Sequence, residues 1–287
     1  MIEWYYLIIV SALLNAASLI VEKSLLRTEH ALRFSMLLAT IIGILSMLLI
    51  PFISQSVSPF ALLLTMIYSA LLAVSYWMTA RLFRHGSLST GSPLYNVLPI
   101  IVIVVGSFFF LGENIGAEKY LAILIILLAT FIMVGQSNKK RDTQQRRYYD
   151  LTIAVVALLI GITNILLKYA LFQINPITFI LLTSIFTPFL VALLIVRRST
   201  EYREKMVSDL RHFIKPLLLM GALVLGYRIF LYSAVAIAPI SIAAPLSSAI
   251  IVVATVLPSG LLFGEHHIPR KVLFSMVMLI AAYFLVA

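Results

Sequence analysis

The chain of 287 residues contains no cysteine. This absence excludes disulfide bonds, thiolate metal sites and catalysis by a cysteine nucleophile. Charged residues are also scarce, at 11% of the chain, whereas 62% of the residues are hydrophobic. Because a soluble domain has about 25% charged and about 45–50% apolar residues, this chain is expected to fold in a membrane.

Ten long apolar segments account for most of the sequence, and each approaches the roughly 20 residues that a spanning helix needs. They cover residues 4–22, 31–50, 59–80, 88–111, 117–135, 151–171, 176–196, 216–235, 239–262 and 268–286. None of them alternates in polarity as the strands of a membrane barrel do, so helices are the expected way to satisfy the backbone in lipid. The pattern predicts an all-α integral membrane protein with ten transmembrane helices.

The sequence contains an internal repeat. Residues 80–113 and 232–265 align without a gap at a constant shift of 152, which matches Pro93 with Pro245 and Glu113 with Glu265. Duplicated hydrophobic units are typical of membrane transporters.

The repeat divides the chain into two halves of five spans each, residues 1–136 and 151–287. The basic residues 137–150 form the predicted cytoplasmic linker between them. Because five is an odd number, the second half enters the membrane from the opposite side. The sequence therefore predicts two inverted five-helix repeats, with a solute site near the middle of the membrane.

Positive charge is distributed unevenly between the loops. Of the 21 lysines and arginines, 18 fall in the odd-numbered loops, two (Lys119 and Lys168) fall on the other side, and Arg228 lies within a span. Basic loops face the cytoplasm, so both termini are expected outside the cell, in a multi-pass protein of the plasma membrane. The basic residues behind the net charge of +10 are therefore expected to orient the protein in the membrane and to contact anionic lipid headgroups. They are not expected to bind nucleic acid. Residues 197–215 are expected to be a charged connector, with an amphipathic surface helix as the alternative.

The two halves share a proline-containing fourth span that ends in a Gly-Glu pair. Ser89-Thr90-Gly91-Ser92-Pro93-Leu94 leads to Leu111-Gly112-Glu113, and Ser241-Ile242-Ala243-Ala244-Pro245-Leu246 leads to Phe263-Gly264-Glu265. These motifs resemble the EamA-type members of the drug/metabolite transporter superfamily over the whole chain. The resemblance implies an exporter or exchanger of small metabolites such as amino acids. Relatives move nucleotide sugars, lipid-linked sugars or drug-like cations, so the fold does not fix the substrate. Many members keep both termini in the cytoplasm, opposite to the orientation that the charges favour here.

Arg228 lies inside the eighth span, where an ionised group is costly and usually faces a cavity or a partner. Arginine stays charged and binds carboxylate or phosphate with two donors. It is therefore the leading candidate to bind an anionic group of the solute. The alternative is a structural arginine that bonds to backbone carbonyls or extends to the interface.

All eleven acidic residues fall at span ends or in loops. Small multidrug members of the superfamily bind cations and protons through a mid-span glutamate in the first helix, where this chain offers Asn15. A cation exporter of that type is thus disfavoured, and Asn15 is a solute-binding candidate. Glu113 and Glu265 are expected to cap the next helix, because a helix N-terminus attracts negative charge.

Further candidates come from related places in the two halves. Lys23 and Lys168 lie late in the first and sixth spans, where each either attracts an anion or anchors the span at the interface. Polar and aromatic side chains gather on spans three, four, eight and nine, where they either line a cavity or serve as interfacial and interhelical contacts. These are Tyr76, Trp77, Tyr95, Asn96, Tyr227, Tyr232, Ser247 and Ser248.

Four prolines interrupt the fourth and ninth spans: Pro93, Pro99, Pro245 and Pro258. A proline inside a helix frees the carbonyl four residues earlier. These positions are expected either to bind solute or bend during gating, or to form static kinks.

The leading hypothesis is a secondary transporter of a small polar or amphipathic metabolite, amino-acid-like and carrying an anionic group, that works by alternating access. A flippase or transporter of a lipid-linked or nucleotide-linked sugar is the alternative. An intramembrane enzyme is the competing class, but no catalytic set lies within the spans. No cofactor, metal or nucleotide-binding motif is indicated, so the expected partners are the solute and membrane lipid. A monomer is the default expectation and a dimer the alternative.

Overall fold

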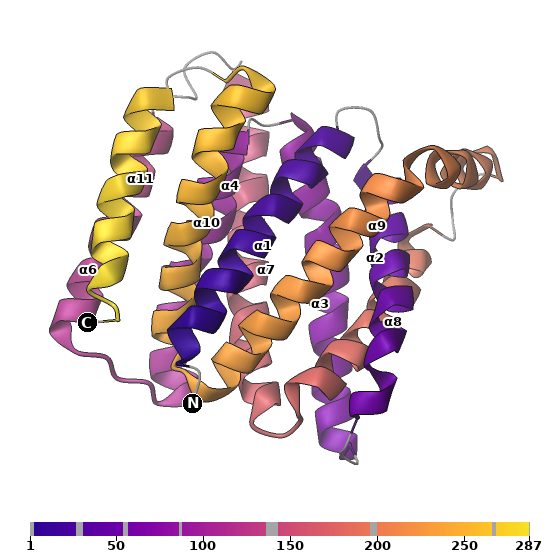
Figure 1. Ribbon diagram of the computed structural model, residues 1–287, viewed down its shortest axis with the longest axis horizontal. Helices are drawn as coiled ribbons and strands as arrows, with labels where there is room; N and C mark the ends of the chain where they lie inside the picture. Colours follow the sequence, from indigo (N-terminus) through magenta and orange to yellow (C-terminus); the bar gives the residue numbers. More distant parts are fainter. Residues whose placement is uncertain are drawn as a thin grey trace.

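The structure is a computed structural model that describes residues 3–26, 31–53, 57–85, 88–135, 143–195, 200–265 and 268–286. The backbone of these residues is almost entirely helical, and no strand occurs among them. Figure 1 shows the helices side by side in one bundle. These helices confirm the predicted all-α fold. They form because, in lipid, a single chain segment can satisfy its backbone groups only within a helix.

The helices follow the predicted spans in order. The first half contains α1 (Trp4–Leu25), α2 (Ala31–Ser46) with its 3-10 extension η1 (Met47–Phe52), α3 (Pro59–His85), α4 (Leu88–Val97), α5 (Pro99–Gly106), the π-helical turn η2 (Ser107–Leu111) and α6 (Ala117–Gly135). The second half contains α7 (Thr143–Leu171), α8 (Pro176–Ile195), α9 (Thr200–Ile237), α10 (Ile240–Phe263) and α11 (Ile268–Tyr283). Elements α4, α5 and η2 together make the fourth span.

Two helices begin well before their predicted spans. Helix α9 begins at Thr200, so the expectation of a connector over 197–215 is wrong from that residue onward, and the extension projects beyond the bundle at the upper right of Figure 1. Helix α7 begins at Thr143, within the predicted linker, while residues 137–142 lie outside the described part. Nine helical segments in the described ranges are long and apolar enough to cross a membrane. Helix α11, of 16 residues, is the shorter tenth.

The two halves pack together through matching pairs of helices. The first helix of each half lies against the third spanning helix of the other half, as α1 with α9 and α7 with α3. The second, fourth and fifth helices pair with their own counterparts, as α2 with α8, α4 with α10 and α6 with α11. The start of α1 and the end of α11 lie at one end of the bundle (Figure 1). This arrangement is that of two inverted five-helix repeats.

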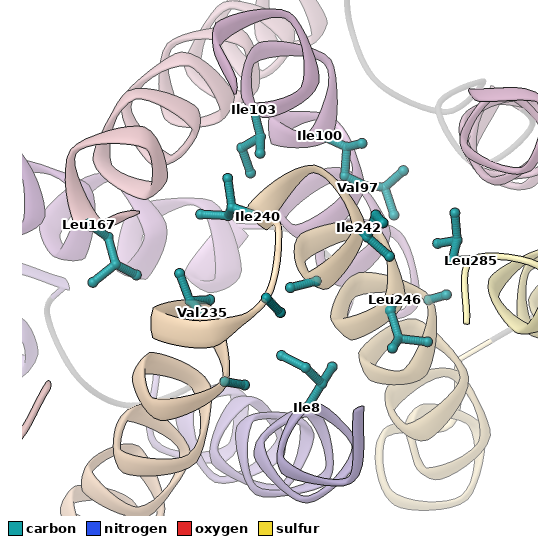
Figure 2. Close-up of a cluster of buried hydrophobic side chains, with 14 of the residues drawn as sticks. Ile8, Val97, Ile100, Ile103, Leu167, Val235, Ile240, Ile242, Leu246 and Leu285 are labelled. Atoms are coloured by element: carbon teal, nitrogen blue, oxygen red, sulfur yellow. The ribbon is translucent and has the colours of Figure 1, made fainter. Parts of the chain in front are cut away.

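The largest apolar cluster joins the halves near one end of the bundle. Figure 2 shows side chains from α1, α5, α7, α9 and α10 converging there, among them Ile8, Ile103, Leu167, Val235 and Ile240. All five are buried, with at most 2% of their surface exposed. Because water and lipid are both excluded, this cluster seals the space between the repeats at that end.

The fourth spans of the two repeats differ in continuity. Pro99 separates α4 from α5, and the span then ends in the π-helical turn η2. Its counterpart α10 stays continuous through Pro245 and Pro258. Position 251, which matches Pro99 in the repeat, is an isoleucine with a backbone N–H to donate, so α10 is not broken there.

Both spans end in the same way. Gly112 and Gly264 adopt left-handed conformations, with φ of 66° and 62°. Glycine takes this conformation without the penalty that a side chain would incur. Each glycine stops its helix and turns the chain, so the glutamate that follows it points back toward the bundle.

Candidate functional site

A cavity of about 130 Å³ lies between the two repeats. Its wall combines polar and apolar side chains from α1, α3, α4, α5, α7, α9 and α10. The polar ones are Asn15, Tyr68, Ser75, Tyr76, Tyr95, Asn96, Thr163, Asn164, Tyr227, Tyr232, Ser247 and Ser248. Ile103, Leu167, Val235 and Ile240, from the apolar cluster of Figure 2, close it at one end.

Two hydrogen bonds mark the approximate symmetry axis that relates the repeats. Arg228 donates from Nη2 to the hydroxyl of Tyr76, and the Ser248 hydroxyl donates to the backbone carbonyl of Asn96 at 2.8 Å. Both pairs are separated by 152 positions, which is the shift of the sequence repeat. A residue that contacts its own counterpart in the other repeat lies close to this axis. The axis therefore passes through the wall of the cavity.

Arg228 is the largest fully buried side chain, with 1% of its surface exposed. Tyr68, Tyr227 and Tyr232 also lie near its charge. Its Nε has no hydrogen-bond partner, and no carboxylate in the described ranges forms a salt bridge with it. The guanidinium thus lies directly behind Tyr76 in the cavity wall, with donor capacity unused.

A second, smaller cavity of about 30 Å³ lies beyond a partition. Asn15, Tyr76, Tyr95 and Tyr227 line both cavities, so these four side chains separate them. Glu22 lines the smaller cavity and is 7% exposed. Glu22 lies at a span end, as the sequence predicted, in the last turn of α1. The direction of its side chain, which faces this cavity, was not predicted.

Glu113 and Glu265 cap helices, but not the helices expected. Glu113 accepts hydrogen bonds from the backbone N–H groups of Ile240 and Ser241, at 3.0 and 2.9 Å, and from the Ser241 hydroxyl at 2.7 Å. Glu265 does the same for Leu88 and Ser89, with backbone distances of 2.6 and 2.9 Å. Each glutamate therefore caps the fourth-span helix of the opposite repeat, and the two caps lie at opposite ends of the pathway.

The lysines of the first and sixth spans bind helix ends. Lys168 donates to the carbonyls of Val235 and Ala238, at 2.7 and 2.9 Å, and Lys23 donates to the carbonyl of Phe83 at 2.6 Å. Cations stabilise the C-terminal end of a helix. Of the solute-binding candidates, Lys168 thus bonds to backbone and is not part of the cavity wall.

The structure brings together eight of the twelve residues that the sequence offered for binding solute or lining a cavity. The eight that line the larger cavity are Asn15, Tyr76, Tyr95, Asn96, Tyr227, Tyr232, Ser247 and Ser248. Arg228 lies behind Tyr76, and Trp77 packs in an apolar cluster with Leu32 and Val191, on α2 and α8. Of the gating candidates, Pro99 lines the cavity beside the helix break.

Sequence reasoning missed several wall residues, of which Asn164 and Tyr68 are the clearest. Asn164 lies one helical turn before Lys168, and its side-chain amide donates to the carbonyl of Ile160 at 2.9 Å. Tyr68 bonds to Tyr232 through their hydroxyls. A polar residue inside an apolar run was the available signal for both. The described part of the chain contains no cluster of three or more histidine or acidic side chains suited to a metal ion.

Comparison with known proteins agrees with this architecture. The sequence model of the EamA-like transporter family matches residues 2–135 and 147–287. A solved structure titled only as the crystal structure of a protein is 14% identical, with a TM-score of 0.68, and the alignment covers 96% of this chain and 98% of that one. At this identity the likeness shows the fold alone. No curated protein matches significantly.

Proposed function

The chain belongs to the EamA-like transporter family, and from this premise we propose that it is a secondary transporter of a small, amino-acid-like metabolite with an anionic group. The family and the helical bundle make it a multi-pass membrane protein of the drug/metabolite transporter type. The solute, its charge and its route are the parts that we infer.

The observation that carries the proposal is the buried charge of Arg228. Burying an unpaired charge costs several kcal/mol, and the described residues offer this guanidinium a tyrosine hydroxyl but no carboxylate. Because Arg228 donates to the Tyr76 oxygen, the Tyr76 hydrogen is left to donate into the cavity. An anionic group bound there gains a polarised donor, and the positive charge behind it gains a counter-charge.

The size of the cavity favours a small solute. A cavity of about 150 Å³ holds a benzene molecule, so the 130 Å³ seen here suits a solute of comparable size. Asn96, Asn164 and Ser247 offer both donors and acceptors for the remaining polar groups of an amino-acid-like molecule. A nucleotide-linked or lipid-linked sugar is much larger, and this conformation does not provide room for it.

The two repeats supply the means of alternating access. Inverted repeats allow two mirror-related conformations, each open toward one side. Here the larger cavity lies toward the apolar cluster and the Glu113 cap, and the smaller one lies toward the Glu22 end. In the opposite conformation the cavity on the Glu22 side would be the larger one. The change between the two conformations would carry the solute past Asn15, Tyr76, Tyr95 and Tyr227.

The proposal is tested by thermal unfolding of the purified protein with amino acids, phosphorylated metabolites, nucleotide sugars and lipophilic cations. A ligand at about 100 times its Kd stabilises the folded state by about 2.7 kcal/mol. We expect a small anionic solute to raise the Tm of the native protein, and expect Arg228→Met to abolish this rise. Tyr76→Phe, which removes one hydroxyl, should weaken it.

Tyr120→Phe is the matched control, because Tyr120 lies on α6 and packs against the apolar cluster, away from the cavity wall. It should leave the ligand response unchanged. Stabilisation by cations that survives equally in Arg228→Met would sink the anionic-solute proposal. A response confined to nucleotide sugars would favour the sugar transporter instead.

The orientation is a separate part of the proposal. We infer that the basic loops face the cytoplasm and that both termini face outward, since 18 of the 21 basic residues lie in the odd-numbered loops. The native sequence has no cysteine, so a single introduced cysteine reports without background. Glu3→Cys should react with an impermeant maleimide on intact cells, whereas Arg84→Cys should react only after lysis.

A further inference from the structure

Glu22 is a buried carboxylate that no basic side chain among the described residues neutralises. It lies in the last turn of α1 and is 7% exposed. Its neighbour Lys23 donates to the carbonyl of Phe83, and no described basic side chain forms a salt bridge with Glu22. An ionised carboxylate in such a place would cost several kcal/mol unless a cation joined it.

The groups around Glu22 do not supply positive charge. The titratable side chains that share its cavity are Tyr76 on α3, Tyr95 on α4 and Tyr227 on α9, while α2 contributes Phe34 and Ser35. Arg228 lines neither cavity and donates its hydrogen bond to the Tyr76 hydroxyl. Tyrosine hydroxyls can donate to a carboxylate, but they bring no charge of their own.

The cavity beside Glu22 is about 30 Å³, which is close to the volume of one water molecule in the liquid. One or two waters fit there and can pass a proton. A metal ion that keeps its own shell of water molecules does not fit. The Ser18 and Ser35 hydroxyls in the wall already donate to the carbonyls of Asn15 and Ala31, so their hydrogens are occupied.

We propose that Glu22 is a proton-binding site on the far side of the Tyr76–Tyr95–Tyr227 partition, and that it couples movement of the solute to movement of a proton. This inference rests on the proposed transport function and deepens it by naming the coupling ion. The carboxyl group holds its proton while the cavity is closed, as here. When the conformation changes and this cavity opens to water, the O–H bond breaks, the proton passes to water and the carboxylate remains.

The partition links the two sites. Tyr76 borders both cavities and carries the bond from Arg228, so any shift of the partition changes both environments at once. An anionic solute beside Tyr76 and a carboxylate beyond it repel each other. Protonation of Glu22 removes that repulsion, and solute and proton therefore favour the same closed conformation.

The first test is independent of any solute. In an ester-free detergent at neutral pH, the infrared spectrum of the native protein should contain the carbonyl stretch of a protonated carboxylic acid. The band should disappear in Glu22→Gln and remain in Glu118→Gln, the control at an exposed carboxylate of α6. Absence of the band from the native protein, or its persistence in Glu22→Gln, would overturn the proton site.

The second test measures coupling in proteoliposomes that contain a pH-sensitive dye, with the anionic solute identified by thermal unfolding. One proton per solute lets a one-unit pH gradient drive about tenfold accumulation. Glu22→Gln should lose this accumulation and still exchange solute for solute. Transport by the native protein without any pH dependence would overturn coupling but leave the transporter proposal standing. Failure of the native protein to move any solute would refute transport, and the infrared result would still decide the proton site.

Discussion

The two helix caps at opposite ends of the pathway have the same sequence pattern but different surroundings. At one end Glu265 binds the start of α4, and Lys271 donates to the Ser89 hydroxyl of the same cap. At the other end Glu113 binds the start of α10, but Lys119, the counterpart of Lys271, donates instead to the carbonyl of Leu285 at 3.2 Å. One cap thus includes a lysine and the other does not.

This difference shows that a repeated sequence does not impose equal structure at both ends. Under the alternating access proposed above, a conformation open to one side is asymmetric, because the two ends are not open together. In this structure the apolar cluster closes the Glu113 end, and the cap at the Glu265 end, beside the smaller cavity, has the additional lysine bond. In the opposite conformation the roles should exchange, with Lys119 joining the Glu113 cap and Lys271 leaving the other.

Removing the two glutamates should give the largest contrast. Glu265→Ala breaks three hydrogen bonds and leaves Lys271 buried without its counter-charge, so we expect a loss of about 3–5 kcal/mol of stability. Glu113→Ala also breaks three hydrogen bonds and removes a negative charge near Lys168, but Lys168 keeps its bonds to two backbone carbonyls, so we expect a smaller loss of about 2 kcal/mol. Thermal or denaturant unfolding of the purified protein measures both, with Glu118→Ala as the exposed control. Equal losses would contradict the asymmetry.

Replacing each of the two lysines by methionine tests the same difference between the caps. Lys271→Met removes a charged hydrogen bond from the closed cap, and such bonds contribute about 1.5–3 kcal/mol. We expect a shift of population toward the conformation open at the Glu265 end, seen as several-fold faster labelling of a cysteine at Ser18. Lys119→Met should leave that labelling rate almost unchanged. A faster rate in both variants would show that the two lysines are equivalent.

The serines of the caps should show a smaller difference in the same direction. Ser89 bonds to both Glu265 and Lys271, whereas Ser241 bonds only to Glu113 among the contacts seen. Loss of a capping side chain costs about 1 kcal/mol. Ser241→Ala should cost about that much and Ser89→Ala about twice as much. Threonine at either position keeps the hydroxyl, and its failure to restore stability would show that the hydroxyl is not the cause.

The break in the fourth span should have the smallest effect on stability. Pro99→Ile gives α4 and α5 the residue that α10 has at the same repeat position and supplies the missing N–H. We expect the free energy of unfolding to change by no more than about 1 kcal/mol. The exchange rate in proteoliposomes should fall several-fold if the break serves gating. An unchanged rate would assign the break to static packing, and Pro258→Ala is the matched change on the other repeat.

The sequence predicted the number, order and approximate ends of the helices, because hydrophobic length and loop charge act locally along the chain. It also predicted eight residues of the cavity wall, since polar residues inside apolar spans are costly unless they face a cavity or a partner. It did not show that Glu113 and Glu265 reach across to the opposite repeat, because such pairing depends on how the halves meet. The inward direction of the Glu22 side chain was not predicted for a similar reason: its position near a span end gave no sign of the side toward which α1 turns it.

The bond between Arg228 and Tyr76 also constrains how this protein arose. In an antiparallel dimer of two identical five-helix chains, every residue on the symmetry axis faces a copy of itself. An arginine at this position would then face another arginine deep in the membrane, and the two positive charges would repel each other. Only when the two copies differ in sequence can one side be tyrosine while the other is arginine. The single positive charge at the centre of the molecule is therefore a property that a symmetric ancestor could not have had.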